Sequence, residues 1–391
     1  MTNQNQPKFV NTKSDFDKFI ELHQGVTWLG FDTEFIGENR LIPLLCLIQI
    51  SSVHGIFLID PIKLKDISPL LSWFEDPNIL KITHAGNNDY ALLYALYTTK
   101  PQNVFDVQIA AGFLGFPYPV GFQKMIKTVL DRSIGKAASI TDWSIRPLSD
   151  KQLVYAADDV RYLHDLWSIF ASRLKDSELF DWAQEEFKLM VHNATVSSNW
   201  KEEFFKFKQI PKLHTKEKLL VLRLLRWRSQ VATEGNISKD AVFPHKMIME
   251  VAKNIKQSKE EIAKHRLLNR SKVKRNWSMF KDFWANREQT TEEKEMLRVV
   301  SNIKRKSPEE NLRYTFLKLM IKQRCYEYGI PDSLIVNGMG LSNPILENFP
   351  VALTSGWRGK MLGPTLVDWL QNKSPLNFEF EKERCVVTRR M

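Results

Sequence analysis

Residues 26–35 read Val-Thr-Trp-Leu-Gly-Phe-Asp-Thr-Glu-Phe, a β-prone run that ends in two carboxylates, Asp32 and Glu34. A carboxylate within apolar sequence is costly to bury unless another group pairs with it. Two more segments have this character: residues 84–89, which end at Asp89, and residues 155–159, which end at Asp159. We therefore expect these four carboxylates to share one site.

The residue types at this site indicate its chemistry. Carboxylate oxygens without histidine or thiolate partners suit hard cations such as Mg²⁺ or Mn²⁺. Two such ions about 3.5–4 Å apart can clamp the attacking and the leaving oxygen of a phosphoryl displacement. The pattern predicts a two-metal phosphodiesterase.

Length and charge indicate how the rest of the chain is organised. The 391 residues are too many for one ordinary core and predict two or three domains. Residues 1–200 hold 18 Lys+Arg and 23 Asp+Glu, a balance of −5, whereas residues 201–391 hold 38 and 22, a balance of +16. This asymmetry favours a metal site joined to a polyanion-binding surface; the plainer alternative is that the lysines solvate helices.

Three cysteines, Cys46, Cys325 and Cys385, are too far apart for a zinc or redox motif and fit a reducing compartment. The polar amino terminus does not resemble a secretory signal. The longest apolar stretch, residues 41–48, is too short to span a membrane. We expect a cytoplasmic protein with no membrane partner.

The first half has the pattern of a mixed α/β domain. Strands are expected at residues 26–31, 45–50, 56–59 and 79–82, followed by a helix at 88–97. This order predicts a three-stranded opening, and then alternating helices and strands.

A longer helix is expected to start near Ser149, which has capping-box spacing to Gln152. Apolar residues then repeat at three and four positions as far as Trp167. Tyr155 and Asp159 are four residues apart, so they share one face of this helix and point into a cleft.

Beyond residue 200 the strand signal nearly vanishes. Two groups of amphipathic helices are expected, at residues 216–233, 246–254, 258–268 and 274–284, and at residues 292–305, 308–328 and 363–371. Charged or turn-rich stretches at roughly 190–212 and 286–292 are expected to be linkers.

The acidic segments, in this order, resemble the D-E-D-D exonuclease superfamily and, within it, ribonuclease D. The segment at 32–35 matches the first motif of the superfamily, Asp89 matches the second, and Tyr155 with Asp159 matches the tyrosine form of the third. Further stretches are similar to ribonuclease D, at residues 45–50, 105–108, 141–143, 146–148 and 355–359. Residues 40–43 depart from that family, because Arg-Leu-Ile-Pro stands where an aromatic cluster is usual.

The resemblance implies an α/β ribonuclease-H-like exonuclease domain followed by two all-α helical domains of the HRDC type, the helicase-and-RNase-D C-terminal module. The expected limits are residues 1–190 for the exonuclease domain, 213–288 for the first HRDC domain and 292–375 for the second.

The resemblance also assigns roles. It implies that Asp32 bridges two ions, that Glu34 and Asp159 hold the ion carrying the attacking water, and that Asp89 serves the other ion. Tyr155 is expected to orient the water, because a phenol with a pKa of about 10 is a poor base at neutral pH.

The implied function is 3′→5′ hydrolysis of RNA, with release of nucleoside 5′-monophosphates. The implied substrates are tRNA precursors and other small structured RNAs with free 3′ ends, and no obligatory protein partner is implied. Two alternatives stay open: a DNA-directed 3′→5′ exonuclease, and a catalytically silent RNA-binding scaffold.

Other polar residues near the motifs have plainer interpretations. Asp158 is expected to be an exposed helix charge, Asp106 a cap or supporting group, and His84 a hydrogen-bond donor that fixes a loop. Asp142 and Trp143 are expected to shape the approach to the Tyr155 helix.

Four basic residues are candidates for RNA contact. Lys272, Lys274 and Arg275 form a possible phosphate-binding cluster, with a solvated loop as the equal alternative. Trp357 and Arg358 are also candidates, although packing at the start of a helix is at least as plausible.

Overall fold

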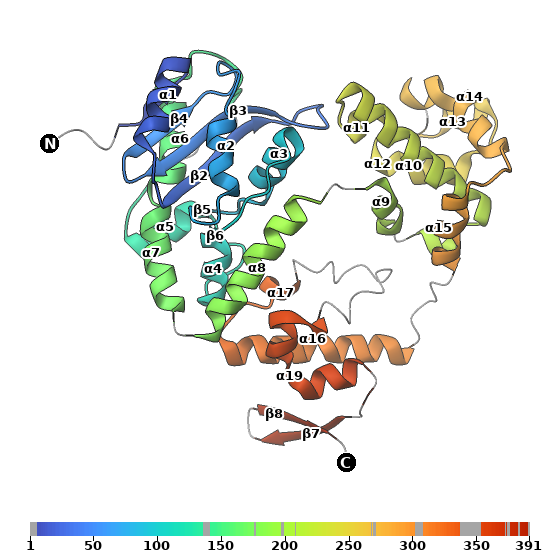
Figure 1. Ribbon diagram of the computed structural model, residues 1–391. Coiled ribbons are helices and arrows are strands. Elements are labelled where there is room, and N and C mark those ends of the chain that lie inside the picture. Colours follow the sequence, from blue (N-terminus) through green and yellow to red (C-terminus); the bar gives the residue numbers. More distant parts are fainter. Residues whose placement is uncertain are drawn as a thin grey trace.

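The computed structural model of the chain describes residues 6–135, 141–175, 177–196, 199–207, 209–266, 268, 271–301, 308–336, 353–371, 373, 376–381 and 384–389. The first half of the chain forms an α/β domain, and helices dominate the second half (Figure 1). None of the helices within these ranges is both long and apolar enough to cross a membrane.

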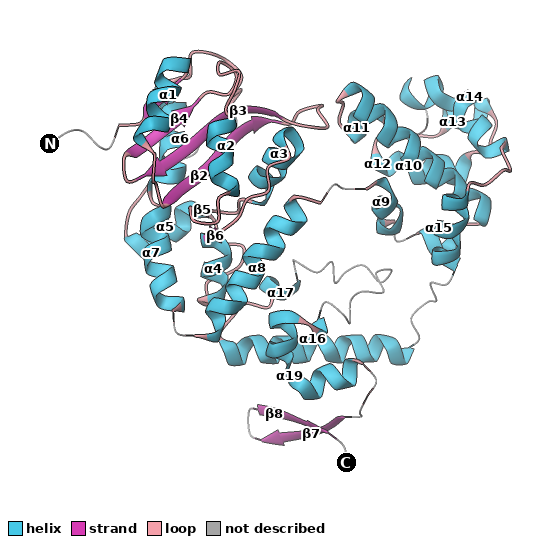
Figure 2. Cartoon of the chain, viewed as in Figure 1, coloured by secondary structure: helices cyan, strands magenta, loops and turns pink. Residues whose placement is uncertain are grey.

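The α/β domain is built on a six-stranded mixed sheet with the order β1-β4-β3-β2-β5-β6 (Figure 2). Its strands are β1 (Lys8–Val10), β2 (Trp28–Ile36), β3 (Leu44–Ser52), β4 (Gly55–Ile59), β5 (Leu80–Thr83) and β6 (Val104–Asp106). β2 pairs with β3 in the antiparallel and with β5 in the parallel direction, so the first acidic segment lies near the middle of the sheet. The four predicted strands are confirmed.

Helices cover both faces of this sheet (Figure 1). In chain order they are α1 (Lys13–Leu22), α2 (Ser68–Glu75), α3 (Asn87–Tyr97), α4 (Val107–Phe113), α5 (Phe122–Leu130), α6 (Asp150–Arg161), α7 (Leu163–Leu174) and α8 (Glu178–Ala194).

Side chains of β2 alternate between these two faces. Leu29 and Phe31 belong to the core that contains the buried residues of α1, α2 and α3. Gly30 faces the junction of α6 and α7: a Cβ atom there would lie 2.1 Å from the Ser51 hydroxyl, which bonds to Val160 of α6, and 3.4 Å from Leu163 of α7. Asp32 and Glu34 follow Gly30 at intervals of two and therefore point to the α6 face.

The prediction of one helix from Ser149 to Trp167 is wrong in one respect, because two helices occupy this stretch. α6 ends at Arg161 and α7 begins at Leu163, with Tyr162 between them at φ −106° and ψ 5°. The Val160 carbonyl accepts a hydrogen bond of 2.8 Å from the Ser51 hydroxyl, which draws the end of α6 onto the sheet. The predicted capping box is confirmed.

The first helical group has a core of its own. It comprises α9 (Trp200–Lys206), the 3₁₀ turn η1 (Ile210–Lys212), α10 (Thr215–Gly235), α11 (Lys239–Val242), α12 (His245–Asn254), α13 (Lys259–Lys264), α14 (Ser271–Ala285) and α15 (Thr291–Ser301).

The stretch expected to be a linker at 190–212 is wrong, because α8, α9 and η1 occupy most of it. Phe204 of α9 is fully buried in the helical core. Glu203 forms ion pairs with Arg228 of α10 and with Lys239 of α11. These contacts fasten α9 to the helical group.

The expected linker at 286–292 is also held in place. Arg223 of α10 donates to the carbonyls of Phe283, Asn286 and Glu288, at 2.6, 2.8 and 2.5 Å. Its guanidinium also pairs with the buried carboxylate of Glu293 in α15, at 3.2 Å. Because α15 shares this core, the packing favours a domain boundary after α15 over the predicted one at 288–292.

The second group consists of α16 (Pro308–Tyr328), α17 (Ser333–Val336), α19 (Gly356–Leu370) and a hairpin of β7 (Leu376–Glu381) and β8 (Arg384–Arg389). The hairpin differs from the helical prediction for this half. The helix predicted at 363–371 starts earlier, at Gly356, and is interrupted at Gly363, where φ is 79° and Pro364 follows. Residues 302–305 of the helix predicted at 292–305 lie outside the described ranges.

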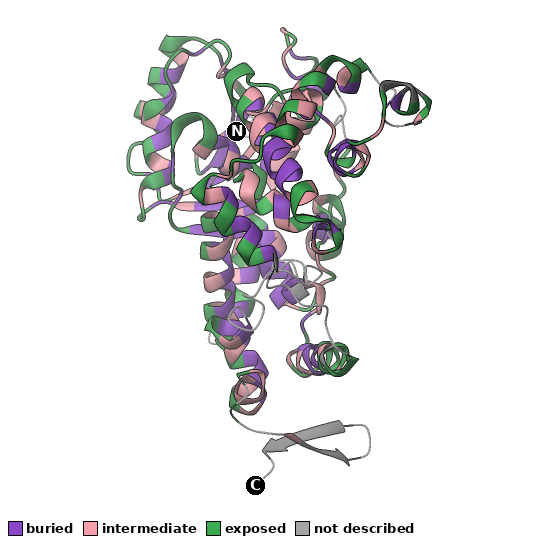
Figure 3. Cartoon of the chain, turned by 90° about the vertical axis from the view of Figure 1, so that its right-hand side faces the viewer, coloured by how far each residue is buried: buried purple, intermediate pink, exposed green. Residues whose placement is uncertain are grey.

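The buried side chains of this second group join a core of the α/β domain. Trp357 of α19 packs on Phe113 of α4, with ring centroids 5.0 Å apart, and on Trp182 of α8, at 5.6 Å. Figure 3 shows the buried residues on the inward faces of the packed helices. In the described part of the chain, the second helical group therefore packs against the α/β domain and shares one of its cores.

The β2–β3 turn touches the first helical group. Asn236, which ends α10 at φ 45°, accepts from the amide of Ile42 through its side-chain oxygen, at 2.8 Å. The amide of Ser238 donates to the Asn39 carbonyl at 2.9 Å. These contacts fall in and beside residues 40–43, the segment that lacks the usual aromatic cluster.

Candidate active site

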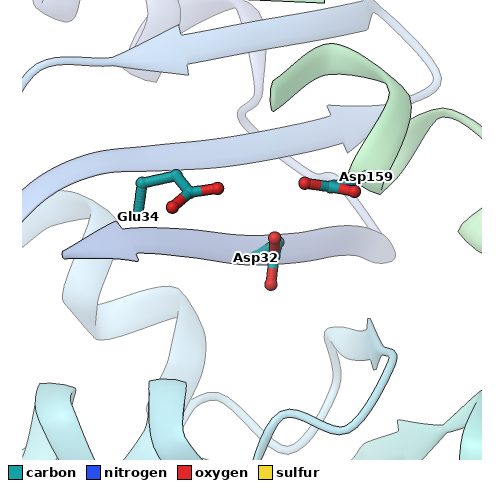
Figure 4. Close-up of side chains that lie close together, drawn as sticks. All are labelled: Asp32, Glu34 and Asp159. Atoms are coloured by element: carbon teal, nitrogen blue, oxygen red, sulfur yellow. The ribbon is translucent and has the colours of Figure 1, made fainter. Parts of the chain in front are cut away.

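Three of the predicted carboxylates meet at one point. Asp32 and Glu34 extend from β2, and Asp159 extends from α6 (Figure 4). One oxygen from each side chain lies within 4.8 Å of the other two. The predicted convergence of these residues is confirmed by this geometry.

The fourth carboxylate, Asp89, lies beside the other three. It is in the first turn of α3 and is buried, with 7% of the residue exposed. The Thr33 hydroxyl, between Asp32 and Glu34 in sequence, donates a hydrogen bond to Asp89. Thr33 therefore ties the second acidic segment to the first.

Burial and mutual repulsion raise the pKa values of these carboxyl groups. Burial raises the pKa of Asp32 well above 3.8, and Asp89, Asp159 and Glu34 raise it further. The pKa of Glu34 rises to about 8, mainly through burial and then through the charge of Asp159. Burial is also the main reason that the pKa is about 7 for Asp159 and about 6 for Asp89.

Such a cluster is suited to bound cations. Four ionised carboxylates this close repel one another, and a divalent ion reverses that cost. The Oδ2 atom of Asp159 is buried and has no hydrogen-bond partner among the described residues. An all-oxygen donor set whose ligand atoms converge within 4.8 Å fits Mg²⁺ or Mn²⁺.

Tyr155 lies one turn before Asp159 on α6 and is half-buried. Burial raises its pKa above the usual 10, and the charges of Asp159, Glu34 and Asp32 raise it further. Hydrogen bonding to Tyr155 lowers the pKa of Asp159, so the phenol faces this carboxylate as a neutral donor. This protonation state agrees with an orienting role.

The segment before α6 is fixed by an ion pair in the interior. Arg146 donates to both Asp60 carboxylate oxygens, at 2.6 and 3.0 Å, and to the Cys46 carbonyl at 2.7 Å. At the start of α6, Gln152 donates to the Thr141 hydroxyl at 3.1 Å. These bonds hold the helix that presents Tyr155 and Asp159.

Asp106 and His84 have supporting roles. Asp106 is fully buried, accepts from the Gly86 amide at 3.0 Å, and caps α4. His84 contacts the Val120 carbonyl at 2.9 Å, and burial lowers its pKa. Neither belongs to the carboxylate cluster, so the plainer interpretations of both residues agree with the structure.

The other residues weighed near the motifs also have local partners. Asp158 pairs with Arg161 at 2.9 Å and is only partly exposed, which differs from the expected exposed charge. Asp142 accepts from Ser144 at 2.6 Å, and Trp143 packs 6.0 Å from Tyr155, as expected for residues that shape the approach to α6.

The structure corrects the candidate RNA contact at Arg358. This residue is only 5% exposed, and its guanidinium pairs with Glu186 of α8 at 2.9 Å. Its neighbour Trp357 donates to the same carboxylate at 2.9 Å. Both residues therefore pack the start of α19 against the α/β domain and are not available to RNA.

The remaining basic candidates lie on a helix, so the solvated-loop alternative is wrong. Lys274 and Arg275 are exposed in the first turns of α14. Lys272 is partly buried and donates to the Ala241 carbonyl, which leaves it less free to contact a phosphate.

Two polar residues beside the site were not predicted to take part in it. Thr33 lies within the first motif but is not acidic, so the sequence gives no indication that it contacts Asp89. Gln49 lies opposite Asp32 in the β2–β3 ladder, and its signal is that it is the one polar residue in the run 44–50.

Known proteins resemble this chain in both of its halves. A family model described as 3′-5′ exonuclease matches residues 7–175, and the HRDC domain model matches residues 217–281. Ribonuclease D of Bartonella henselae is 28% identical over 376 residues, which cover 94% of this chain and 90% of the relative. Ribonuclease D of Desulfotalea psychrophila is 32% identical over 260 residues, or 66% of this chain and 70% of the relative.

The chain belongs to the ribonuclease D family. It is thus a 3′→5′ exoribonuclease, as the resemblance in its sequence implied. The fold is that of Escherichia coli RNase D, with a TM-score of 0.78 at 22% identity over 94% of this chain and 98% of that one. The catalytic core of RRP6 from Trypanosoma brucei shares the fold with a TM-score of 0.57, at 19% identity over 73% of this chain and 80% of that one.

Proposed function

We propose that this exoribonuclease removes 3′ extensions from tRNA precursors and other small structured RNAs, releasing nucleoside 5′-monophosphates with the help of two Mg²⁺ or Mn²⁺ ions. The observation that carries the proposal is the convergence of Asp32, Glu34 and Asp159, whose ligand oxygens lie within 4.8 Å of one another. Asp89 adjoins them through Thr33 and completes the proposed set of ligands.

Each carboxylate has a proposed place in the ligand set. Asp32 would be shared by both ions, Glu34 and Asp159 would hold one ion, and Asp89 would serve the other. When bound, the ions supply an activated water and neutralise charge on the leaving 3′ oxygen. The protein contributes fixed carboxylates in a partly buried site, where electrostatic interactions are stronger than in water.

Tyr155 would orient the attacking water. Its hydroxyl stays protonated at neutral pH because burial and the neighbouring carboxylates raise its pKa. A neutral phenol can donate one hydrogen bond and accept another, which fixes a water molecule without removing its proton.

The basic half of the chain would hold the RNA body. Lys274 and Arg275 are exposed on α14, and two more exposed lysines approach the Trp284 ring at the other end of this helix. The Nζ atoms of Lys216 and Lys256 lie 6.0 and 5.6 Å from the centroid of that ring. Cations beside an indole suit phosphate contacts and base stacking, which bind RNA with little regard to sequence.

Several broader expectations belong to the same proposal. The domain limits would be 1–190, 213–288 and 292–375. If shared packing defines a domain, the end of the first helical domain moves from residue 288 to the end of α15. Cys46 and Cys325 are free and buried, which suits a cytoplasmic protein. The proposal needs no obligatory protein partner.

A 3′-extended tRNA precursor tests this function directly. The purified full chain should shorten it from the 3′ end and release nucleoside 5′-monophosphates when Mg²⁺ or Mn²⁺ is present, and should not do so in EDTA. A matched DNA oligonucleotide should be digested more slowly. Faster digestion of DNA would favour the DNA-directed alternative, and metal-independent binding without digestion would favour the silent scaffold.

A further inference from the structure

Gln49 has an unusual position beside the metal-binding carboxylates. It lies on β3 directly opposite Asp32 of β2. The residue is fully buried, and neither the oxygen nor the nitrogen of its carboxamide has a hydrogen-bond partner among the residues that the structure describes. A buried amide without partners is destabilising, so a residue of this kind calls for an explanation.

The ladder shows which way the Gln49 side chain points. Residues directly opposite in an antiparallel pair project from the same face of the sheet, so Gln49 shares the face of Asp32. Ser51 is two residues further along β3 and on the same face, and its hydroxyl contacts the Val160 carbonyl of α6. The Gln49 side chain therefore lies between β3 and α6, the helix that carries Asp159.

A suitable acceptor lies on that helix. The Oδ2 atom of Asp159 is also buried and also lacks a hydrogen-bond partner in the described part of the chain. A carboxylate oxygen accepts and an amide nitrogen donates two hydrogens, so the two unpartnered groups are complementary. A residue that hydrogen-bonds to a metal-binding side chain fixes the orientation of that side chain, and its loss commonly lowers metal affinity.

We propose that Gln49 is the positioning residue for Asp159: in the cation-loaded site its Nε2 donates to Asp159 Oδ2 and fixes how that carboxylate faces the ions. This inference rests on the proposed metal-dependent function. It assigns the role to a residue that is neither acidic nor in contact with the reacting phosphate. It also accounts for a polar side chain in a strand that is otherwise apolar from Leu44 to Ile50.

The test replaces Gln49 by Met, which keeps the length of the side chain and removes both hydrogen-bonding groups. Mn²⁺ binding to the metal-free full chain is measured by electron paramagnetic resonance, and kcat and KM are measured on a 3′-extended RNA. We expect Mn²⁺ affinity and kcat to fall about 10–100-fold, the usual effect of losing such a supporting group. KM should stay unchanged, and the melting temperature in EDTA should be equal or higher, because an unpaired buried amide is gone.

Two further variants separate positioning from packing. Ser52→Ala is the matched control on the same strand: its hydroxyl bonds to His23 at 2.7 Å on the other face of the sheet, so the change should lower the melting temperature and leave Mn²⁺ affinity unchanged. Gln49→Leu replaces Gln49→Met should the latter fail to fold.

The outcomes distinguish this inference from the proposed function. Wild-type Mn²⁺ affinity and kcat in Gln49→Met would overturn the positioning role. A parent protein that neither binds Mn²⁺ nor digests RNA would overturn the proposed function itself.

Discussion

Asp32, Glu34 and Asp159 repel one another across the site, and this repulsion is the physical basis for its use of cations. Each carboxyl group has a raised pKa, first because it is buried and then because the others are charged. Removing one of them lowers the repulsion but also removes a ligand. In the proposed two-metal mechanism the loss of the ligand would dominate the rate, because bound ions would supply most of the stabilisation of the developing charge.

Asp32→Asn should therefore nearly abolish hydrolysis while leaving RNA binding largely intact, and Asp159→Asn should act similarly. The two groups of basic helices that would hold the RNA are untouched by either change. Single-turnover digestion and RNA affinity, measured on the same preparation, check this expectation. Digestion near the parent rate by either variant would show that the two-metal assignment is wrong.

Tyr155→Phe keeps the aromatic ring and deletes the hydroxyl that would orient water. A positioned proton-handling group contributes roughly 10²–10⁴-fold, and an orienting hydroxyl should fall at or below the low end of that range. The measurement is the single-turnover rate at saturating Mg²⁺. An unchanged rate would indicate that Tyr155 only packs against Trp143, whose ring is 6.0 Å away.

The raised pKa of Glu34 predicts how stability depends on pH without cations. Its pKa in the folded protein is about 8, against an ordinary value of 4.5, so the folded state binds more protons between these values. The contribution of Glu34 to stability is therefore lost as pH rises from about 4.5 through 8. The melting temperature in EDTA should fall over this range, and added Mg²⁺ should raise it more at pH 8 than at pH 6.

Glu34→Gln is the control for this titration. The substitution removes the ionisable group and keeps its size, so the melting temperature in EDTA should decline less steeply with pH. Identical slopes for the parent and Glu34→Gln would contradict the assignment of this pH dependence to Glu34.

At the scale of elements, helix α6 determines whether the site forms, because it carries both Tyr155 and Asp159. Its first turn is closed by the Ser149–Gln152 capping box, and its last turn is held to β3 by Ser51. The segment before it is held by Arg146 and Asp60. The helix is thus fixed at both ends by side chains outside the carboxylate cluster.

Ser149→Ala should destabilise the protein by about 0.5–2 kcal/mol, the usual cost of losing a helix N-cap. The serine accepts from the Gln152 amide at 3.3 Å, and the substitution removes this bond. Urea unfolding followed by circular dichroism gives the free energy of unfolding. Lys13→Ala, at the exposed start of α1, is a matched control and should change it by less than Ser149→Ala does.

Local sequence patterns predict some elements well and others poorly, for physical reasons. β3 and the α6 cap are predictable because an apolar run and a capping box are encoded by neighbouring residues. The end of α6 at Arg161 is not, since the apolar repeat continues past it and the contact that ends the helix comes from Ser51, 109 residues away from Val160. α9 is short and four of its seven residues are charged, and the pairing of its Glu203 with α10 and α11 is not visible in its local sequence.

At the site, the convergence of Asp32, Glu34 and Asp159 is predictable, because residue type and motif order indicate it. Two neighbours of the site could not be predicted from local sequence. The bond from Thr33 to Asp89 and the position of Gln49 opposite Asp32 both arise from tertiary structure. The prediction for Arg358 is wrong because a basic residue in a basic half suggests RNA, whereas Glu186 of α8 neutralises it in the interior.

At the scale of the whole molecule, the two helical groups relate differently to the α/β domain. The second shares its core, through Trp357 and residues of α16 and α17. The first has its own core and contacts the domain by hydrogen bonds between residues 39–42 and the end of α10. Removing everything beyond residue 200 would therefore strip apolar cover from the α/β domain, so charge is better tested by substitution in the full chain.

The double substitution Lys274→Gln with Arg275→Gln tests whether α14 contacts phosphates. Both side chains are exposed, so their removal should leave folding unchanged. Each phosphate that the protein no longer neutralises should reduce the slope of log affinity against log salt by about 1, because fewer counterions are released on binding. In an Asp32→Asn background, which prevents digestion, affinity for a tRNA precursor should weaken across the salt series and the slope should fall by about 2.

The control is the double substitution Lys13→Gln with Lys18→Gln on α1, where both lysines are exposed and pair with aspartates. It removes the same net charge from the α/β domain and should leave the slope unchanged. Equal slopes for the two double variants would show that α14 does not contact RNA and that its positive charge is a solvated surface.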